Sequence, residues 1–313
     1  MEDNIDFLPA ASTVTNILNK KDFCFSAEII PPRNGTNFNE VFKQIDALKK
    51  ANFDFISVTH GAGGSLRGGT LPICYHTQHR YNLTSIAHLT VRGASKEGLE
   101  NALIDHHYFG VRNILALRGD PPDGIGKPFK TVPGGFSYAH ELITLIDRMN
   151  HGEYIPRKNF DNEKFRQGIK TDFCIGVACY PEDEESKRIQ YLQHKVNAGA
   201  SFAVTQMILD SQLFLNYQDE VNNEISRDFP LLLGLRIPNS LKMLNRLKNK
   251  FNIPVESALL DKMKNSKEEK WQETGLEWAK PFIEKAKANG TRGVHFFIMG
   301  DPTPSIEVKK FFD

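Results

Sequence analysis

Residues 173–209 read FCIGVACYPEDEESKRIQYLQHKVNAGASFAVTQMIL, and this stretch decides the fold. It opens with a short apolar run at 173–180 and closes with a second one at 202–209. Between them lies a charged segment at 184–198 whose apolar residues recur at helical spacing. A strand, a helix and a strand in this order predict a parallel β-α-β unit.

The same alternation extends from this unit in both directions along the chain. The other predicted strands are 23–30, 55–60, 86–91, 114–119, 231–237 and 294–299. The other predicted helices are 39–51, 71–81, 95–108, 138–150, 211–225, 239–250 and 272–289, with a polar, Lys-rich addition at 255–271. Eight repeats in about 300 residues fit a (β/α)8 TIM barrel better than an open doubly wound sheet. We therefore predict an α/β protein with a single catalytic (β/α)8 domain over 1–313, in which 1–20 form an N-terminal extension.

Composition excludes several classes of partner. The 313 residues include 39 Lys+Arg and 38 Asp+Glu, and this balance argues against nucleic acid as the main partner. The longest apolar runs, such as 231–235, fall far short of the ~20 residues that span a bilayer, and the first ten residues do not resemble a signal peptide. Four cysteines form no CxxC pair, and the His, Cys and acidic residues show no zinc spacing. We expect a cytoplasmic protein without a metal, a membrane partner or a nucleic-acid partner, and a homo-oligomer stays open.

The first predicted strand carries a carboxylate toward the barrel interior. Strand alternation puts Cys24, Ser26 and Glu28 on the inner face and the other residues under the helices. Function gathers at the C-terminal ends of such strands. Because burial raises the pKa of a carboxyl group, Glu28 is suited to act as a general acid. A salt bridge to a neighbouring Lys or Arg is the alternative.

The fourth predicted strand leads into Arg118, Gly119 and Asp120. A guanidinium there suits an anionic group, and Asp120 could hold an amino-bearing heterocycle. Gly119 lets the backbone approach a ligand closely. Mutual pairing of Arg118 and Asp120 is the alternative.

Two longer connections flank the following helix. Residues 121–137 include eight Pro or Gly, which predicts a non-helical loop on the catalytic face, either a ligand cradle or surface decoration. The polar stretch 151–171 should lie at the opposite, structural end of the barrel.

Further polar residues follow other strands. Thr59 precedes a glycine turn that lacks the full GxGxxG pattern, and His88 lies late in the third strand. Tyr180 offers a ring and a hydroxyl, and the amide of Gln206 both donates and accepts hydrogen bonds. Each could equally be a packed strand residue. Five strand ends with suitable chemistry together indicate a ligand site.

These motifs resemble the methylenetetrahydrofolate reductase family, and they occur in family order from residue 23 to about 300. The matching stretches are FSAE (25–28), PPR (31–33), SVTHGAG (57–63), AHLT (87–90), LALRGD (115–120), IGVA (175–178), YPE (180–182), KV (195–196), AGA (198–200), VTQ (204–206) and VHFF (294–297). The resemblance implies a bacterial-type catalytic barrel that binds FAD without a Rossmann unit.

The resemblance also implies an activity and roles for individual residues. NAD(P)H would reduce 5,10-methylenetetrahydrofolate to 5-methyltetrahydrofolate by a ping-pong hydride relay through flavin. Glu28 would be the general acid that assists ring opening, and Asp120 would contact the pterin and tune the flavin. Gln206 would serve folate and nicotinamide in turn, and Met243 and Leu247 occupy substrate-contact positions. The residues implied to line the FAD site are Thr59, His60, Ala62, His88, Leu117, Arg118, Gly119, Asp120, Tyr138, Ala139, Tyr180 and Lys195.

Some positions depart from the bacterial pattern. Acidic residues 183–185 follow Glu182, where some members place a His that contacts FAD. Met243 and Leu247 stand where such members use Gln and Phe, and Asp301 stands where they often have Arg.

Three other functions stay open at this point. One is another flavin-dependent barrel oxidoreductase of the proline-dehydrogenase type. The second is a flavin-free, folate-binding methyl-transfer barrel that works with a corrinoid protein, and the third is a non-catalytic partner subunit. A flavin absorption band separates the oxidoreductases from the rest. The sequence does not distinguish NADH from NADPH, because it holds no Rossmann acidic residue or 2′-phosphate clamp.

Overall fold

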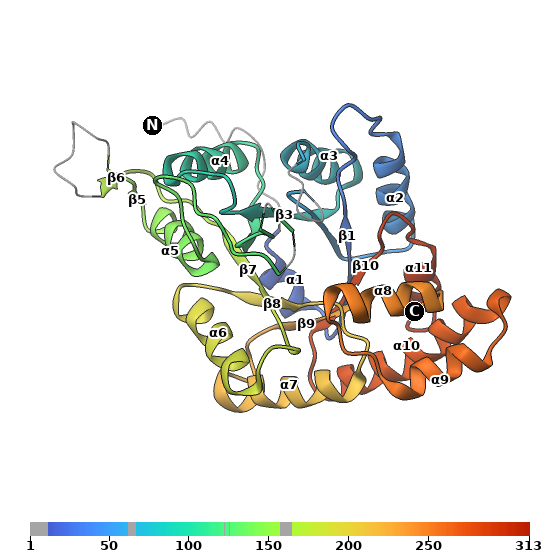
Figure 1. Ribbon diagram of the computed structural model, residues 1–313. Coiled ribbons are helices and arrows are strands. Elements are labelled where there is room, and N and C mark those ends of the chain that lie inside the picture. The colour runs from blue at the N-terminus through green and yellow to red at the C-terminus, as the bar shows by residue number, and fades with distance from the viewer. Residues whose placement is uncertain (1–11, 62–66, 122, 125, 157–164) are drawn as a thin grey trace.

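The computed structural model describes residues 12–61, 67–121, 123–124, 126–156 and 165–313. Eight parallel strands close into a barrel in the order β1-β10-β9-β8-β7-β4-β3-β2 (Figure 1). They are β1 (Cys24–Ile29), β2 (Phe55–Val58), β3 (Thr84–Thr90), β4 (Asn113–Leu117), β7 (Cys174–Cys179), β8 (Phe202–Thr205), β9 (Leu231–Leu235) and β10 (Gly293–Phe297). Each strand overlaps a predicted run, and the predicted TIM barrel is confirmed.

Helices follow the barrel strands and surround them (Figure 1). The predicted ones are α2 (Asn39–Lys50), α3 (Thr70–Tyr81), α4 (Lys96–Tyr108), α5 (Ala139–Asn150), α6 (Glu185–Asn197), α7 (Ser211–Glu224), α8 (Leu241–Phe251) and α10 (Trp271–Ala288). The sequence did not predict α1 (Val14–Lys20), α9 (Ser257–Asn265), the 3-10 turn η1 (Glu268–Lys270) or α11 (Thr303–Lys309). Within the described ranges, no helix combines the length and apolar character needed to cross a membrane.

Apolar side chains form two clusters on opposite faces of the barrel wall. On β1, Phe25, Ala27 and Ile29 belong to the outer cluster, which fills the space between strands and helices. Cys24 belongs to the inner cluster, at the amino end of the barrel. The inner cluster consists of Val14, Leu18, Cys24, Phe55, Ile86, Leu115, Cys174, Phe202, Val204 and Leu232. The alternation predicted for residues 23–30 is therefore confirmed.

Helix α1 closes the amino end of the barrel. Val14 and Leu18, four residues apart on one helix face, are fully buried in the inner cluster. The backbone N–H of Val14 donates to Oδ1 of the buried Asn113, the first residue of β4, at 2.8 Å. Residues 14–20 fall within the predicted N-terminal extension, and the structure gives them a place in the core.

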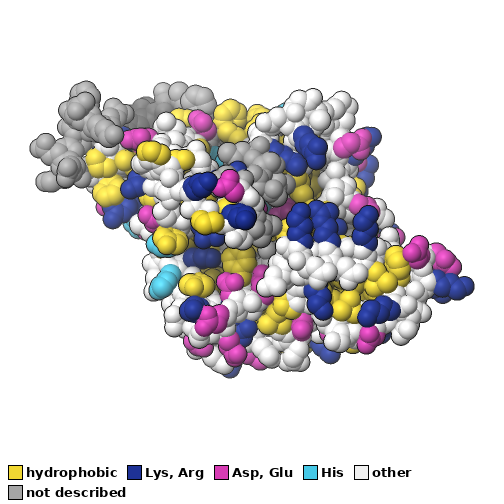
Figure 2. Space-filling view, in the orientation of Figure 1, with side chains coloured by type: hydrophobic (Ala, Val, Ile, Leu, Met, Phe, Trp, Pro, Cys, Tyr) yellow, Lys and Arg dark blue, Asp and Glu magenta, His cyan; other side chains and the backbone are white. Residues whose placement is uncertain are grey.

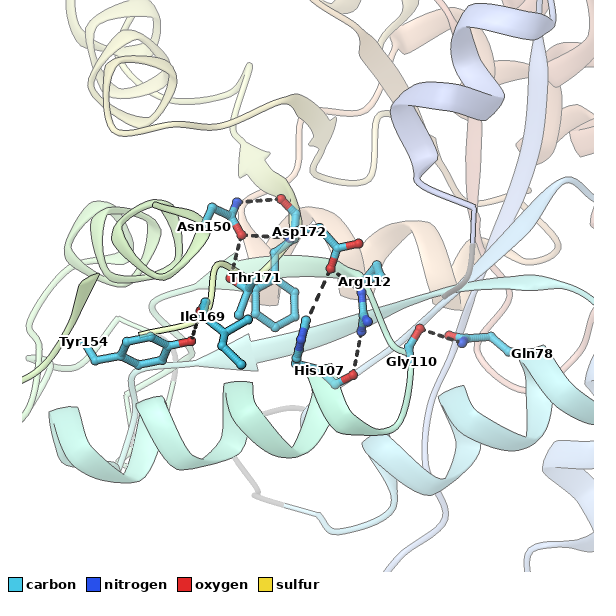
Figure 3. A network of polar contacts seen from close by, with 10 residues as sticks. Gln78, His107, Gly110, Arg112, Asn150, Tyr154, Ile169, Thr171 and Asp172 are labelled. Atoms are coloured by element: carbon cyan, nitrogen blue, oxygen red, sulfur yellow. Dashed lines mark hydrogen bonds and ion pairs between the residues drawn. The ribbon is translucent and has the colours of Figure 1, made fainter. Parts of the chain in front are cut away.

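A polar network ties the loops together at the amino end of the strands (Figure 3). At the end of α5, Oδ1 of Asn150 accepts from the N–H of Phe173 (2.8 Å) and Nδ2 donates to its carbonyl (2.9 Å). Beside them, Asp172 forms an ion pair with Arg112. The stretch 151–171 thus ends where β7 begins, at the structural end as predicted. It also contains an unpredicted hairpin of β5 (Glu153–Tyr154) and β6 (Arg166–Gln167).

Candidate active site

Inside the barrel, polar side chains lie next to the apolar inner cluster, on the side of the carboxyl ends of the strands. The alternation that buries Cys24 places Ser26 and Glu28 next on the inner face of β1. Ser26 pairs in register with Phe55 of β2 and His295 of β10. Halfway up, His295 of β10 lies between two buried serines. Its Nδ1 is 2.8 Å from Oγ of Ser26 and its Nε2 is 3.1 Å from Oγ of Ser57.

The buried histidines of this layer are neutral at physiological pH. Burial lowers the pKa of His295 to about 3, and burial together with the nearby His295 and His60 lowers the pKa of His88 to about 3. Nε2 of His88 is buried without a hydrogen-bond partner among the described residues. Sequence reasoning did not select His295. Its position as the second residue of the strand predicted over 294–299 was the available signal.

Glu28 lies above this layer, near the end of β1. In the barrel register it lies between Ser57 of β2 and Phe297 of β10. Its side chain is largely buried, and this desolvation raises the pKa of the carboxyl group to about 8. In the part of the chain that the structure covers, no cation forms an ion pair with Glu28. The salt-bridge alternative is therefore not what the structure shows, and Glu28 is protonated at neutral pH.

The ends of β2 and β3 bring Thr59, His60 and His88 together. Thr59 continues the β2 ladder, because its N–H donates to the carbonyl of Ile29 at 3.0 Å. Its Oγ1 is buried and has no hydrogen-bond partner among the residues that the structure describes. Nδ1 of His60 accepts from the N–H of Thr90 at 3.4 Å, and burial lowers the pKa of His60. Ala62 lies outside the described residues.

After β4, the chain turns at Leu117, Arg118, Gly119 and Asp120. Gly119 has φ +83°, a conformation that L side chains rarely adopt, and an added Cβ would lie 3.1 Å from the Cβ atoms of Thr90 and Arg92. The guanidinium of Arg118 lies over the ring of Phe129, 5.4 Å from its centroid. No ion pair joins Arg118 to Asp120 within 4.0 Å, so the two charges do not neutralise each other directly.

The loop after β4 packs against neighbouring elements. Phe129 reaches Arg118, and the carbonyl of Gly134 accepts from the N–H of Lys96 at 2.9 Å. As predicted, the described part of 121–137 contains no helix. Tyr138 and Ala139 follow at the start of α5. Tyr138 is 57% exposed and stacks on His140, with ring centroids 5.5 Å apart.

The end of β7 places Tyr180 and Glu182 beside the turn after β4, and Lys195 reaches this region from α6. Nζ of Lys195 donates to the carbonyl of Ala178 at 2.7 Å and lies 5.5 Å from the ring centroid of Tyr180. Tyr180 is 37% exposed as a whole, and desolvation of its hydroxyl raises the pKa to about 12, with smaller contributions from Glu182 and Asp120. Burial likewise raises the pKa of Glu182 to about 7 and lowers that of Lys195.

Glu182 is a polar residue of this region that the sequence did not select as a site residue. Its Oε2 is buried without a partner among the described residues. In the sequence Glu182 appears only within the YPE stretch of the family resemblance, and the structure shows that its carboxyl oxygen is buried.

Gln206 follows β8 directly, and its N–H still donates to the carbonyl of Cys179 of β7 at 2.9 Å. The hydroxyl of Thr205 accepts a hydrogen bond from the N–H of Gly234 at 2.8 Å and donates one to the carbonyl of Gln206 at 2.9 Å. On the side of β9, pairing resumes only at Ile208, and the observed strand ends at Thr205, so the strand predicted over 202–209 is too long. Gly234 allows this close approach, because a Cβ there would lie 2.2 Å from the carbonyl oxygen of Thr205. Oε1 of Gln206 accepts from the N–H of Met207 at 2.9 Å.

Met243 and Leu247 are buried residues of α8. They are 7% and 2% exposed and pack in the outer apolar cluster, on the buried face of α8. Their role in substrate binding stays a prediction.

Arg236 is a further residue that sequence reasoning missed. It follows the all-apolar β9 directly, and its side chain is half-buried. Burial, and next the positive charge of Arg246, lower its pKa.

The sequence match to one family covers nearly the whole barrel. The family model described as methylenetetrahydrofolate reductase matches residues 13–310. The chain belongs to the methylenetetrahydrofolate reductase family. The eight strand ends described above all fall within the matched residues.

Individual relatives agree with this membership. Methylenetetrahydrofolate reductase (NADH) 1 of Zea mays is 30% identical over 88% of this chain and 46% of its own length. The chain thus spans about half the length of the plant relatives that it matches. The 5,10-methylenetetrahydrofolate reductase of Pectobacterium carotovorum subsp. carotovorum is 29% identical over 88% of this chain and 85% of its own length.

Solved structures of low identity share the fold. A protein of Clostridium thermocellum, described as binding two copies of 5-methyl-5,6,7,8-tetrahydrofolic acid, superposes with a TM-score of 0.57. It is 14% identical, and the match covers 95% of this chain and 98% of that protein. At this identity the likeness supports the barrel architecture alone.

Proposed function

We propose that this protein reduces 5,10-methylenetetrahydrofolate to 5-methyltetrahydrofolate, with electrons that NADH or NADPH delivers through bound FAD. The observation that carries the proposal is the state of Glu28. Its carboxyl group lies at the mouth of a barrel of this family, is largely buried and has a pKa raised to about 8. A protonated Glu28 would give its proton to the nitrogen that leaves the methylene carbon when the five-membered ring opens.

Unpaired polar atoms at the mouth support a flavin there. Thr59 Oγ1, His88 Nε2 and Glu182 Oε2 are buried without partners in the described structure, although buried polar atoms are normally hydrogen-bonded. A polar ligand that reaches these strand ends would satisfy them. Arg118 and Lys195 would hold the charged portions of FAD, and His60, Leu117, Gly119, Tyr138, Ala139 and Tyr180 would line its site. FAD supplies the hydride acceptor and donor that the side chains of this chain lack.

Two further residues would orient the folate. Asp120 is exposed beside the β4 turn and close enough to Tyr180 to raise its pKa, so its carboxylate would meet the amino groups of a pterin near the flavin. Gln206 would present its amide to folate and nicotinamide in turn, because a ping-pong sequence brings both to the same flavin face.

Absorption spectroscopy followed by anaerobic titration tests the proposal. The purified protein should show a flavin band that NADH or NADPH bleaches and methylenetetrahydrofolate restores. Bleaching by nicotinamide without restoration by folate would favour an oxidoreductase of the proline-dehydrogenase type. Folate binding without flavin would favour a methyl-transfer barrel, and binding of neither would favour a partner subunit.

The pH profile of the folate half-reaction should follow the Glu28 carboxyl group. The raised pKa means that the protonated form dominates below about 8 and is lost above it. Reoxidation of the reduced flavin by methylenetetrahydrofolate should therefore slow as pH rises through about 8. Stopped-flow traces between about pH 6 and about pH 10 measure this fall in the reoxidation rate. A flat profile over that range would remove Glu28 from the role of proton donor.

Replacement of Gln206 by glutamate should weaken folate use several-fold. The backbone N–H of Met207 already occupies Oε1, so the amide nitrogen is the part of the side chain left to contact a ligand. Glutamate keeps the acceptor and replaces the donor with a charge, which removes a hydrogen bond of roughly 0.5–1.5 kcal/mol. The KM for methylenetetrahydrofolate measures the effect, with Gln212→Glu on the surface of α7 as the control. Equal KM values in the two variants would contradict a hydrogen bond from the Gln206 amide to the folate.

A further inference from the structure

A cavity lies between the loops that follow β9 and β10. It has a volume of about 40 Å³, which leaves room for a small polar group of a ligand and not for a whole ligand. Arg236 and Asn239 line it from the β9 side, Phe297 and Asp301 line it from the β10 side, and Ser305 of α11 completes it. Because both loops follow carboxyl ends of parallel strands, the cavity opens on the same side of the barrel as Glu28 and Gln206.

Arg236 brings an uncompensated positive charge to this cavity. Within the described part of the chain, its guanidinium forms no hydrogen bond and no ion pair, although its side chain is half-buried. After burial, the charge that lowers its pKa further is that of a second cation, Arg246 of α8. A partly desolvated guanidinium beside another cation is unfavourable unless an anion joins them.

The acid that shares the cavity has another partner. Oδ1 of Asp301 accepts from the N–H of Thr303 at 3.0 Å and so holds the start of α11. No ion pair joins Asp301 to Arg236 within 4.0 Å. The helix beside the cavity adds positive charge only. On α8, Lys242, Arg246, Lys248 and Lys250 are exposed and the helix has no acidic residue (Figure 2).

We propose that this space, the Arg236 cavity, is an anion site that receives a carboxylate or phosphate group of the substrate at the barrel mouth. The inference rests on the proposed function and adds to it a residue that decides substrate affinity. Two substrates carry such a group. Folates end in the carboxylates of glutamate, and nicotinamide dinucleotides carry phosphates. A guanidinium binds either group bidentately, so the chemistry at Arg236 is shared.

Steady-state kinetics of Arg236→Met test the site. The variant should fold and retain FAD, because loss of an unpaired half-buried charge removes a desolvation cost. If the anion is the folate carboxylate, the KM for methylenetetrahydrofolate should rise about tenfold or more, with kcat nearly unchanged. The analogue that lacks the glutamyl group should show no such rise. If the anion is a phosphate, the KM for nicotinamide should rise instead, and a larger rise for NADPH than for NADH would identify the 2′-phosphate.

Two controls define the outcome. Arg227→Met removes an exposed arginine near the amino end of β9 and should leave every KM unchanged. Arg236→Lys keeps the positive charge but loses the bidentate geometry of the guanidinium. Its KM for the affected substrate should therefore lie between those of the wild type and Arg236→Met. A folded Arg236→Met protein with wild-type KM values for folate, NADH and NADPH would overturn the anion site while the proposed function stands. A wild-type protein that turns over neither substrate would overturn the proposed function first, and the anion site with it.

Discussion

Replacement of Glu28 by glutamine should slow the folate half-reaction by about 10²–10⁴-fold and leave flavin reduction by nicotinamide near its wild-type rate. Glutamine has the shape of the protonated acid and can donate a hydrogen bond, but it cannot transfer a proton. Proton donation assists the opening of the folate ring, whereas hydride transfer from nicotinamide to flavin needs no such donor. The variant should also fold normally, because Glu28 is uncharged at neutral pH and an amide needs no more desolvation than the protonated acid.

Stopped-flow spectroscopy of the two half-reactions measures this difference. The flavin band is followed first on mixing with NADH or NADPH, and then on mixing the reduced protein with methylenetetrahydrofolate. Glu40→Gln, at an exposed position in the first turn of α2, is the matched control and should leave the rates of both half-reactions unchanged. Equal slowing of both half-reactions by Glu28→Gln would assign Glu28 to flavin or ligand binding instead.

Replacement of Leu18 by alanine should lower the free energy of unfolding by about 2–5 kcal/mol. Leu18 is fully buried in the inner cluster, at the end of the barrel opposite the candidate site. Truncation would leave a cavity that the closed strands cannot fill, because the hydrogen-bonded barrel wall holds its diameter. Urea denaturation followed by circular dichroism measures the loss, and an unchanged m value shows that the same surface is exposed on unfolding.

Asn19→Ala provides the comparison for this variant. Asn19 is the next residue of α1 and is exposed, so its truncation should change the free energy of unfolding by less than about 0.5 kcal/mol. If Leu18→Ala were equally mild, α1 would not be docked in the barrel in solution. The folate and nicotinamide KM values of both variants should match the wild type below the unfolding transition, since the site lies at the other end of the strands.

The barrel could be predicted from the sequence because its pattern repeats. Each strand is a short apolar run bounded by polar residues, and eight such runs of similar spacing favour one closed sheet. Alternation along residues 23–30 was sufficient to place Glu28 inside. Helix α1 escaped prediction because seven residues with two buried apolar positions give almost no periodic signal.

The rest of the candidate site depends on distances that the sequence does not encode locally. His295, Glu182 and Arg236 each stand in an ordinary strand or turn pattern. Their surroundings come from other strands: two serines around His295, a buried carboxyl position for Glu182 and an unpaired charge at Arg236. Conversely, Met243 and Leu247 were selected by position in a motif, and the structure places them in the outer cluster.

The pairing of β1 with β10 also has a consequence for synthesis on the ribosome. The first barrel strand leaves the ribosome long before the last one, and until β10 arrives one edge of β1 has unpaired N–H and C=O groups. During that interval Glu28 has no neighbour at the position of Phe297, so water reaches its carboxyl group and its acidity is that of an ordinary glutamate. In a nascent chain Glu28 is therefore an ordinary acidic residue. It acquires the raised pKa of a proton donor only when β10 pairs with β1 and closes the barrel.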